Sequence, residues 1–247
     1  MSFTDKVVLI TGASAGIGAV TAEQFAKEGA SLALVGRNEA KLKAVVEKCH
    51  ALGAKTFAIK ADVSKDKEAD SIVKKTIEVF GKLDVLVNNA GILRQSGITA
   101  DGFLEVYDEV MNTNMRGPVR ISRSAVPSLI ETKGNIINIS SVAANLVKQP
   151  EYSAYKTSKA ALNHFTRCIA FELAPHGVRV NSISPGPVHT DIFDGVGINA
   201  ESLSEVTALL KASDSIEIAD LILYVASDKA KSITGSNYII DNGSCLI

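Results

Sequence analysis

Thr11-Gly12-Ala13-Ser14-Ala15-Gly16-Ile17-Gly18 is the stretch that decides the fold. It follows the apolar run 7–11 directly and opens an amphipathic stretch at Gly16, so it is predicted to join a strand to a helix. Glycines at such a turn let backbone N–H groups approach a phosphate, and the helix N-terminus adds partial positive charge. The pattern therefore predicts a pyrophosphate cradle, in preference to a helix-start loop that merely contains glycines.

Short apolar runs alternate with amphipathic stretches along the rest of the chain. Such alternation is typical of a parallel sheet wound by crossover helices, and strands that are apolar on both faces indicate helices on both sides. We therefore predict an α/β fold, a Rossmann-type doubly wound parallel sheet that forms a single dinucleotide-binding and catalytic domain over 1–247. The expected strands are 7–11, 32–35, 57–61, 83–87, 135–139, 178–182 and 238–240, and the later helices are 119–130 and about 153–173.

One segment, 193–215, breaks this rhythm because it is rich in Gly, Ser and Asn around a short apolar-periodic piece, 203–210. A loop of this length in a compact domain is usually functional. It follows a strand end, where open α/β sheets bind ligands. We predict a substrate lid there, and the alternative is a plain surface excursion.

The composition bounds the partners and the compartment. A net charge of -1 and the lack of a Lys/Arg run argue against nucleic acid and favour a small molecule. Cys49, Cys168 and Cys245 have no metal-ligand spacing, so we expect reduced thiols and no metal. No signal region and no apolar run of about 20 residues is present, which predicts a cytoplasmic protein without a membrane span.

The end of the second strand bears on the choice of cofactor. An acidic residue there usually binds the free ribose hydroxyl of NAD(H), whereas this chain has Gly36 followed by Arg37. A guanidinium would bind the additional phosphate of NADP(H). We therefore expect NADP(H) to be favoured over NAD(H), unless Arg37 is only a solvated side chain.

Two overlapping matches to Tyr-x-x-x-Lys occur, Tyr152 with Lys156 and Tyr155 with Lys159. The helix face that continues from Tyr155 is mostly apolar and the other is polar, so Tyr155 and Lys159 are predicted to face the sheet and cofactor, and the other pair water. A nearby lysine favours the phenolate and lowers the tyrosine pKa, as proton transfer near neutral pH requires.

Ser140 and Ser141 end the preceding strand, and only one of them can point into the site because strand side chains alternate.

The glycine spacing G-x-x-x-G-x-G, the segment Asn88-Asn89-Ala90-Gly91 and the Tyr155/Lys159 pair together resemble the classical short-chain dehydrogenase/reductase family over essentially the whole chain. The resemblance implies that Asn114, Ser141, Tyr155 and Lys159 are catalytic. It also implies that Lys159 bonds the nicotinamide ribose. The expected cofactor-binding residues are Gly12, Ser14, Gly16, Ile17, Gly18, Arg37, Asp62, Val63, Asn89, Ala90, Gly91, Tyr155, Lys159, Pro185, Gly186, Val188 and Thr190.

Some of these residues have other interpretations. Asp62 could cap the following helix, Asn114 could be a helix cap or kink residue, and Pro185 and Gly186 could simply end a strand. The chain also departs from the family at Asp241-Asn242-Gly243, where Asp-Gly-Gly is common, and around 213–218.

The sequence thus predicts an oxidoreductase, a carbonyl reductase or dehydrogenase, that passes hydride between NADP(H) and a secondary alcohol/ketone or aldehyde substrate. The apolar lid piece suggests a lipophilic substrate such as a steroid, isoprenoid or fatty-acyl carbonyl. By family analogy we expect a homo-oligomer, a homodimer or homotetramer. The alternative is a catalytically silent NADP(H)-binding sensor or scaffold; a methyltransferase or epimerase would leave the Tyr/Lys pair unexplained.

Overall fold

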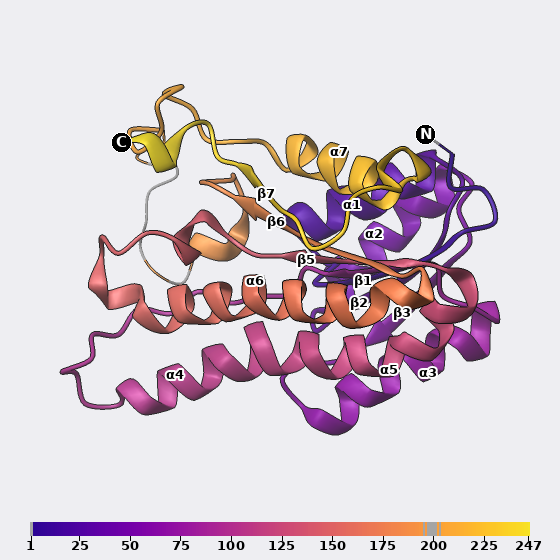
Figure 1. Cartoon of the computed structure of the whole chain (residues 1–247), viewed down its shortest axis with the longest axis horizontal. Coiled ribbons are helices and arrows are strands. Elements are labelled where there is room, and N and C mark those ends of the chain that lie inside the picture. The colour runs from indigo at the N-terminus through magenta and orange to yellow at the C-terminus, as the bar shows by residue number, and fades with distance from the viewer. Residues whose placement is uncertain (1, 195, 197–201, 203) are drawn as a thin grey trace.

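A seven-stranded parallel sheet forms the centre of the molecule (Figure 1). The computed structural model describes residues 2–194, 196, 202 and 204–247. The strands lie in the order β3-β2-β1-β4-β5-β6-β7, and every neighbouring pair is parallel. Their bounds are β1 Val7–Thr11, β2 Ser31–Gly36, β3 Thr56–Lys60, β4 Val85–Asn88, β5 Asn135–Ile139, β6 Arg179–Pro185 and β7 Asn237–Ile240.

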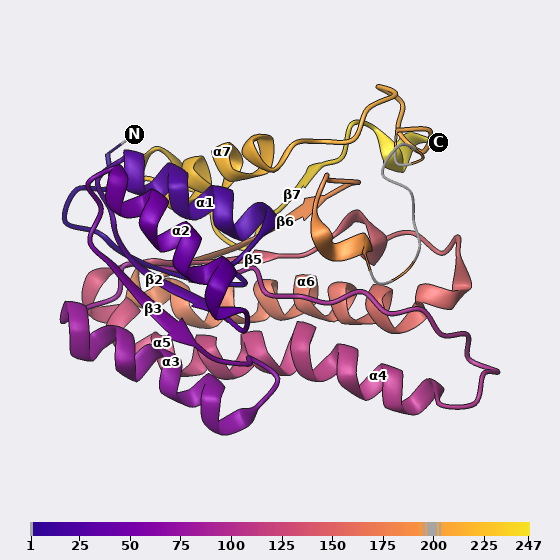
Figure 2. The same ribbon diagram turned by 180° about the vertical axis from the view of Figure 1, so that it is seen from behind.

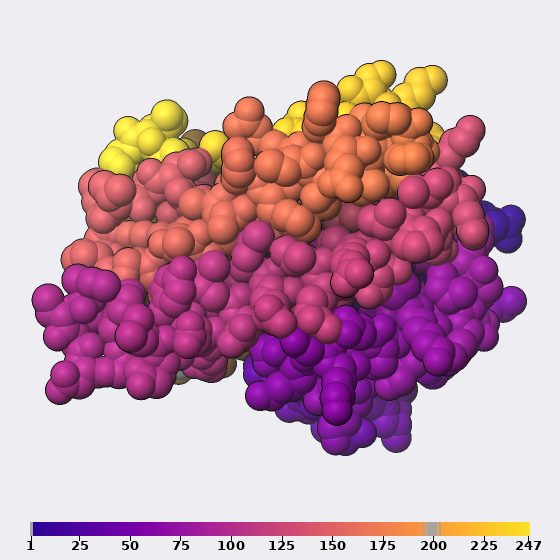
Figure 3. Space-filling model, turned by 60° about the horizontal axis from the view of Figure 1, so that its bottom comes forward, coloured from indigo at the N-terminus to yellow at the C-terminus, as the bar shows by residue number. Residues whose placement is uncertain are grey.

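Helices cover both faces of this sheet, which confirms the predicted doubly wound α/β fold. On one face lie α1 (Gly16–Lys27), α2 (Glu39–Ala51) and α7 (Ser215–Ala226) (Figures 1 and 2). On the other lie α3 (Asp66–Phe80), α5 (Gly117–Thr132) and α6 (Ser153–Leu173), with α4 (Phe103–Met111) beside α6. Figure 3 looks onto this second layer, where α6 borders α4 and α5 at the surface.

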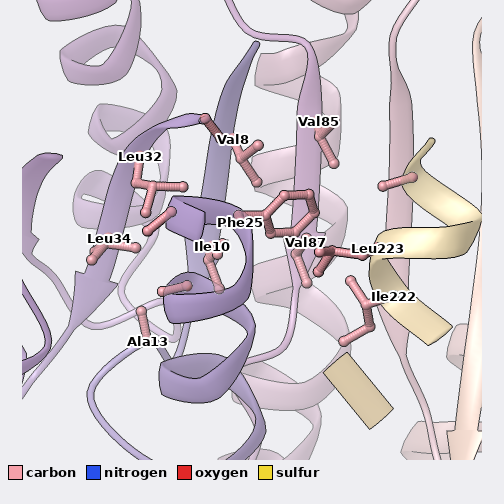
Figure 4. Packing of buried hydrophobic residues seen from close by; sticks show 14 of the residues in the cluster. Val8, Ile10, Ala13, Phe25, Leu32, Leu34, Val85, Val87, Ile222 and Leu223 are labelled. Atoms are coloured by element: carbon pink, nitrogen blue, oxygen red, sulfur yellow. The ribbon is translucent and has the colours of Figure 1, made fainter. Parts of the chain in front are cut away.

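The larger core cluster lies between the sheet and the α1/α7 layer (Figure 4). The Phe25 ring of α1 points into the space between β1 and β4, where it is fully buried among Val8, Ile10 and Val87. Ile222 of α7 packs against the same cluster. Burial of each such side chain contributes about 1.5–3 kcal/mol. This packing holds α1, and the glycine turn that precedes it, against the sheet.

The strand order reverses direction at β1, because β2 and β3 lie on one side of it and β4 to β7 on the other. Open α/β sheets bind ligands at such a switch point, outside the carboxyl ends of the strands. The turn after β1 and the segment after β4 therefore meet at one edge, since Ile10 pairs with Val87 in register.

The region between β4 and β5 differs from the sequence prediction, which began the helix only at 119. Instead α4 leads through a π-helix, Asn112–Arg116, into α5. Pro118 lies in the first turn of α5, where its missing N–H is tolerated because the preceding turn is widened. The helix is therefore distorted before Gly117-Pro118 but not broken.

Candidate active site

The glycine turn is held by side chains from the end of β4. The Asn89 amide donates to the carbonyl oxygens of Thr11, at 2.9 Å, and Gly12, at 3.2 Å, while the Thr11 hydroxyl accepts from the backbone N–H of Asn89 at 3.0 Å. Gly12 and Gly16 have φ of +66° and +52°, a backbone conformation that residues other than glycine rarely adopt. A Cβ on Gly18 would lie 2.3 Å from the Gly12 carbonyl oxygen. The turn is therefore built for glycine at all three positions.

A cavity of about 1300 Å³ opens at this edge of the sheet. Pockets for drug-sized ligands measure about 300–1,000 Å³, so this one has room for a dinucleotide and a second molecule. Among the predicted site residues, only Gly18 and Asn114 do not line it: Gly18 packs against Gly12 inside the turn, and Asn114 is fully buried behind the wall. Those lining it are Gly12, Ser14, Gly16, Ile17, Arg37, Asp62, Val63, Asn89, Ala90, Gly91, Ser141, Tyr155, Lys159, Pro185, Gly186, Val188 and Thr190.

Tyr155 and Lys159 lie one helical turn apart on α6, and Tyr155 bonds with Ser141, two residues after β5. The Lys159 ammonium lies 5.7 Å from the centre of the Tyr155 ring and donates to the Ile139 carbonyl oxygen at 2.8 Å. Burial raises the pKa of Tyr155, while a hydrogen bond with Ser141 acts in the opposite direction. Burial lowers the pKa of Lys159 to about 8. Burial thus favours the neutral form of both side chains.

The two serines after β5 have different partners. The Ser140 hydroxyl is buried and donates to the Lys159 carbonyl oxygen at 3.1 Å, so it ties β5 to α6. The Ser141 side chain faces Tyr155 instead, although its oxygen also accepts the Ala143 N–H at 3.1 Å. Strand alternation left the choice between the two serines open, and the structure brings Ser141 to Tyr155.

Asn114 lies in the π-helix and supports the site from behind. Its side chain accepts from the Ile92 N–H at 2.8 Å and donates to the Ile92 carbonyl oxygen at 2.9 Å and to the Ser158 hydroxyl at 3.1 Å. Ser158 in turn donates to the Tyr155 carbonyl oxygen at 2.6 Å. Asn114 therefore joins the segment after β4 to α6, and it is neither a helix cap nor a direct contact of the cavity.

Charged pairs lie along the cavity beyond β2. Arg37 is largely exposed, and its guanidinium lies 4.0 Å from the Asp62 carboxylate. Burial would raise the pKa of Asp62, but hydrogen bonds from Ser64 and the charge of Arg37 lower it overall. Lys41 of α2 forms an ion pair at 2.6 Å with Asp191, which follows β6. Lys41 was not among the predicted site residues, although it follows Arg37 by four positions in the first turn of α2.

The excursion after β6 is closed at its base. Val188 forms a bridge with Ser213, and the His189 N–H donates to the Ser213 carbonyl oxygen at 3.0 Å. The predicted lid, 193–215, thus starts a few residues after this bridge and ends where α7 begins. Residues 195, 197–201 and 203 of that lid lie outside the described residues, and the described part of 203–210 forms turns and not a helix.

The C-terminal segment lines the cavity too, which no pattern in the sequence indicated. Ser244 and Ile247 reach its wall, and Lys148 donates to the Ile247 backbone oxygen at 3.4 Å. Asn242, where glycine is common in the family, has φ of +51°. Asparagine is one of the few other residues that adopt this conformation readily, so the departure keeps the turn.

The prediction for Tyr152 and Lys156 was wrong. Both were predicted to point more toward water, and both line the cavity. Tyr152 is only 7% exposed. It caps the N-terminus of α6 outside the regular helix, with φ of -103°, so the helical stripe used to place it does not apply.

Within the described residues, no group of three or more His, Cys, Asp and Glu side chains is arranged to hold a metal ion. No helix in that part of the chain is long and apolar enough to cross a membrane.

Comparisons with known proteins give one consistent result. A family model described as Enoyl-(Acyl carrier protein) reductase matches residues 12–244. An uncharacterized oxidoreductase of Thermotoga maritima is 38% identical over 257 residues, covering 100% of both chains. The 3-oxoacyl-(acyl-carrier-protein) reductase FabG of Staphylococcus aureus is 37% identical over 96% of this chain and 97% of its own. A short chain dehydrogenase from Burkholderia cenocepacia, solved in complex with NADP, has a TM-score of 0.93 at 34% identity and covers 99% of this chain and 100% of its own.

Proposed function

The chain belongs to the short-chain dehydrogenase/reductase family of oxidoreductases, and we propose from this premise that it interconverts a secondary alcohol and a ketone, or an alcohol and an aldehyde, with NADP(H). One observation carries the proposal. The Tyr155 side chain bonds with Ser141 at the wall of a cavity whose other end is the glycine turn, with the buried Lys159 beside it. A proton donor and a dinucleotide cradle thus share one space.

The residues of this chain would divide the work as follows. A bound nicotinamide cofactor supplies or accepts the hydride. The Tyr155 hydroxyl gives a proton to the substrate oxygen during reduction and takes it back during oxidation. The Ser141 hydroxyl orients that oxygen, and a charged Lys159 would oppose the rise that burial causes in the pKa of Tyr155. Asn114 is a positioning residue, because it holds α6 through Ser158.

A preference for NADP(H) over NAD(H) is supported by Arg37 at the end of β2. Its exposed guanidinium lines the cavity, and the only carboxylate near it is Asp62, at 4.0 Å within the described residues. An arginine in this state can bind a phosphate through two parallel hydrogen bonds. The relative from Burkholderia cenocepacia was solved with NADP, which is consistent with this preference.

A lipophilic substrate is supported by the wall beyond Tyr155. Apolar side chains from the loop after β5 and from the excursion after β6 form it: Val142, Leu146, Ile192, Phe193 and Val206. Steroid, isoprenoid and fatty-acyl carbonyls would all bury apolar area against such a surface. The name of the Staphylococcus aureus relative refers to an acyl substrate of that protein.

The test is a panel of ketones, aldehydes and alcohols, read by nicotinamide absorbance, with Tyr155→Phe beside the native protein. Loss of general acid–base catalysis is expected to lower kcat by about 10²–10⁴-fold. Tyr224→Phe, an exposed tyrosine of α7, is the control. Equal turnover by Tyr155→Phe and the native protein would contradict the mechanism. Tight cofactor binding without turnover of any compound would favour the sensor or scaffold.

Two further expectations belong to the same proposal. We infer a homodimer or homotetramer from the family resemblance, and we propose a cytoplasmic location, where the free thiols of Cys49, Cys168 and Cys245 would stay reduced. Sedimentation equilibrium would test the first, and fractionation of the native cell the second.

A further inference from the structure

The second Tyr-x-x-x-Lys match, Tyr152 with Lys156, has no part in the proposed reaction, yet both residues line the same cavity. They precede Tyr155 and Lys159 by three positions. Lys156 and Lys159 both lie inside α6, where three residues rise about 4.5 Å, so Lys156 lies roughly one turn from Lys159, and Tyr152 lies just before the first turn of the helix. The second pair therefore borders the space where the rest of a substrate would extend.

Two ammonium groups in this part of the cavity donate to backbone oxygens. Lys156 donates to the Gln149 carbonyl oxygen at 3.0 Å, and the adjacent Lys148 donates to the Ile247 backbone oxygen at 3.4 Å. Within residues 2–194, 196, 202 and 204–247, neither forms an ion pair with an Asp or Glu side chain. Burial lowers the pKa of Lys156, and the charge of Glu151 opposes that effect.

Two of the three acids in the described lining pair with other cations. Asp62 lies beside Arg37 and Asp191 pairs with Lys41, both on the α2 side. Glu205 is the remaining acid of the described lining, and it is exposed. Lys148, Lys156 and Lys159 therefore leave a positive charge excess in an otherwise largely apolar wall. In ligand sites, a few polar groups in an apolar lining fix the orientation of the ligand.

We propose that Lys148, Tyr152 and Lys156 bind an anionic group of the substrate, a carboxylate or a phosphate, about one helical turn from the reacting carbon. The substrate is then an amphiphile, with an apolar body against the loop walls and a negative charge at these lysines. Both anions accept hydrogen bonds from ammonium and phenol groups, and such charge-assisted bonds are stronger than neutral ones. The inference rests on the proposed function, because that function places the reacting carbon at Tyr155.

Binding tests the subsite without turnover. Hexanoate, hexyl phosphate and neutral hexanamide are titrated by calorimetry into protein saturated with whichever nicotinamide dinucleotide binds more tightly. A bond to a charged group contributes about 1.5–3 kcal/mol, which is roughly a 10–150-fold preference for an anion over the amide. The better of the two anions identifies the group. Equal affinity for the amide and both anions would overturn the proposal.

Variants assign that preference to the lysines. Lys148→Gln and Lys156→Gln should each reduce the anion-to-amide affinity ratio about tenfold, whereas Lys156→Arg keeps the charge and should keep the ratio. The control is Lys75→Gln, at an exposed position of α3 outside the cavity lining. An unchanged ratio in both cavity glutamine variants would overturn the proposal.

A substrate pair separates this inference from the proposed function. 4-Oxohexanoate and 4-oxohexanamide are compared as ketones by their kcat/KM values. A lower KM for the acid than for the amide, lost in Lys156→Gln, supports the subsite. Turnover of both ketones with equal KM overturns the subsite and leaves the proposed reaction standing. A binding preference for the anions without turnover of any carbonyl compound would instead leave the subsite standing and remove the proposed reaction.

Discussion

At the scale of single residues, Arg37 is expected to decide which dinucleotide binds. Arg37→Asp replaces a phosphate-binding cation with an anion that repels the phosphate and can accept from a ribose hydroxyl. The ratio of NADP(H) to NAD(H) affinity should fall by at least about tenfold, because a bond to a charged group contributes about 1.5–3 kcal/mol. Fluorescence titration with each reduced cofactor measures it, with Arg123→Asp on the exposed side of α5 as the control. An unchanged ratio would remove Arg37 from this role.

Lys159 should make stability depend on pH in a direction that its burial fixes. Its pKa falls from 10.5 to about 8 on folding, so between these values the unfolded chain binds the proton and the folded protein does not. Stability contributed by this group therefore rises with pH across that window, by roughly 3 kcal/mol at most. Urea unfolding of the native protein and of Lys159→Met at pH 7.5 and pH 10 measures the difference. A parallel pH dependence in both proteins would contradict the shift.

Helical periodicity placed Tyr155 and Lys159 correctly but not Lys156, which lies in the same helix and also lines the cavity. Tyr155 and Lys159 lie inside α6, so helical periodicity placed them at the sheet side, and the structure brings them to Ser141. Tyr152 lies at the cap of the same helix, where periodicity no longer holds, and it was placed wrongly. Ile247 reaches the cavity through tertiary packing alone, and no local pattern could have shown it.

At the scale of elements, Arg179 of β6 holds the C-terminal end of α7. Its guanidinium donates to the carbonyl oxygens of Val225 at 2.9 Å and Ala226 at 3.3 Å, and to that of Ile233 at 3.3 Å in the loop beyond. Arg179→Ala leaves these oxygens without their charged donor, and should lower the free energy of unfolding by about 1.5–3 kcal/mol. Urea unfolding should show a lower midpoint with an unchanged slope. Arg123→Ala is the control, and an equal midpoint in both variants would show that the bonds contribute nothing measurable.

The boundaries of helices and strands were predictable where a regular pattern of apolar residues stops abruptly. The strand Asn135–Ile139 and the helix Ser153–Leu173 were predicted with the bounds that the structure has. The helix Phe103–Met111 was missed, because it continues through a π-helix into a segment that starts with Gly117-Pro118. Local propensity signals a break there, but packing of α4 against α6 keeps the chain helical.

At the scale of the whole molecule, the fold class could be predicted because alternating strands and helices leave few arrangements, whereas the order of the strands was not predicted. The α/β class, the parallel sheet and the position of the glycine turn followed from that alternation. The walls that close the cavity could not be predicted in this way, because they are formed by segments that are far apart in the sequence. The excursion after β6 is pinned at Val188 and Ser213, and the chain end near Lys148 completes the wall.

The cavity extends from Arg37 to Tyr155 across the switch point of the sheet, so a ligand that spans it should stabilise the whole fold. A ligand present at 100 times its Kd, and bound only by the folded state, adds about 2.7 kcal/mol. For a domain of this size, 1 kcal/mol raises Tm by about 2–4 °C, so saturating NADP⁺ should raise it by about 5–10 °C. NAD⁺ at the same concentration should raise Tm less, because it lacks the phosphate that Arg37 would bind. Nicotinamide mononucleotide covers only the Tyr155 half of the cavity and should raise it least. Differential scanning fluorimetry measures all three shifts, and an equal shift with the mononucleotide would mean that the α2 side of the cavity does not bind the dinucleotide.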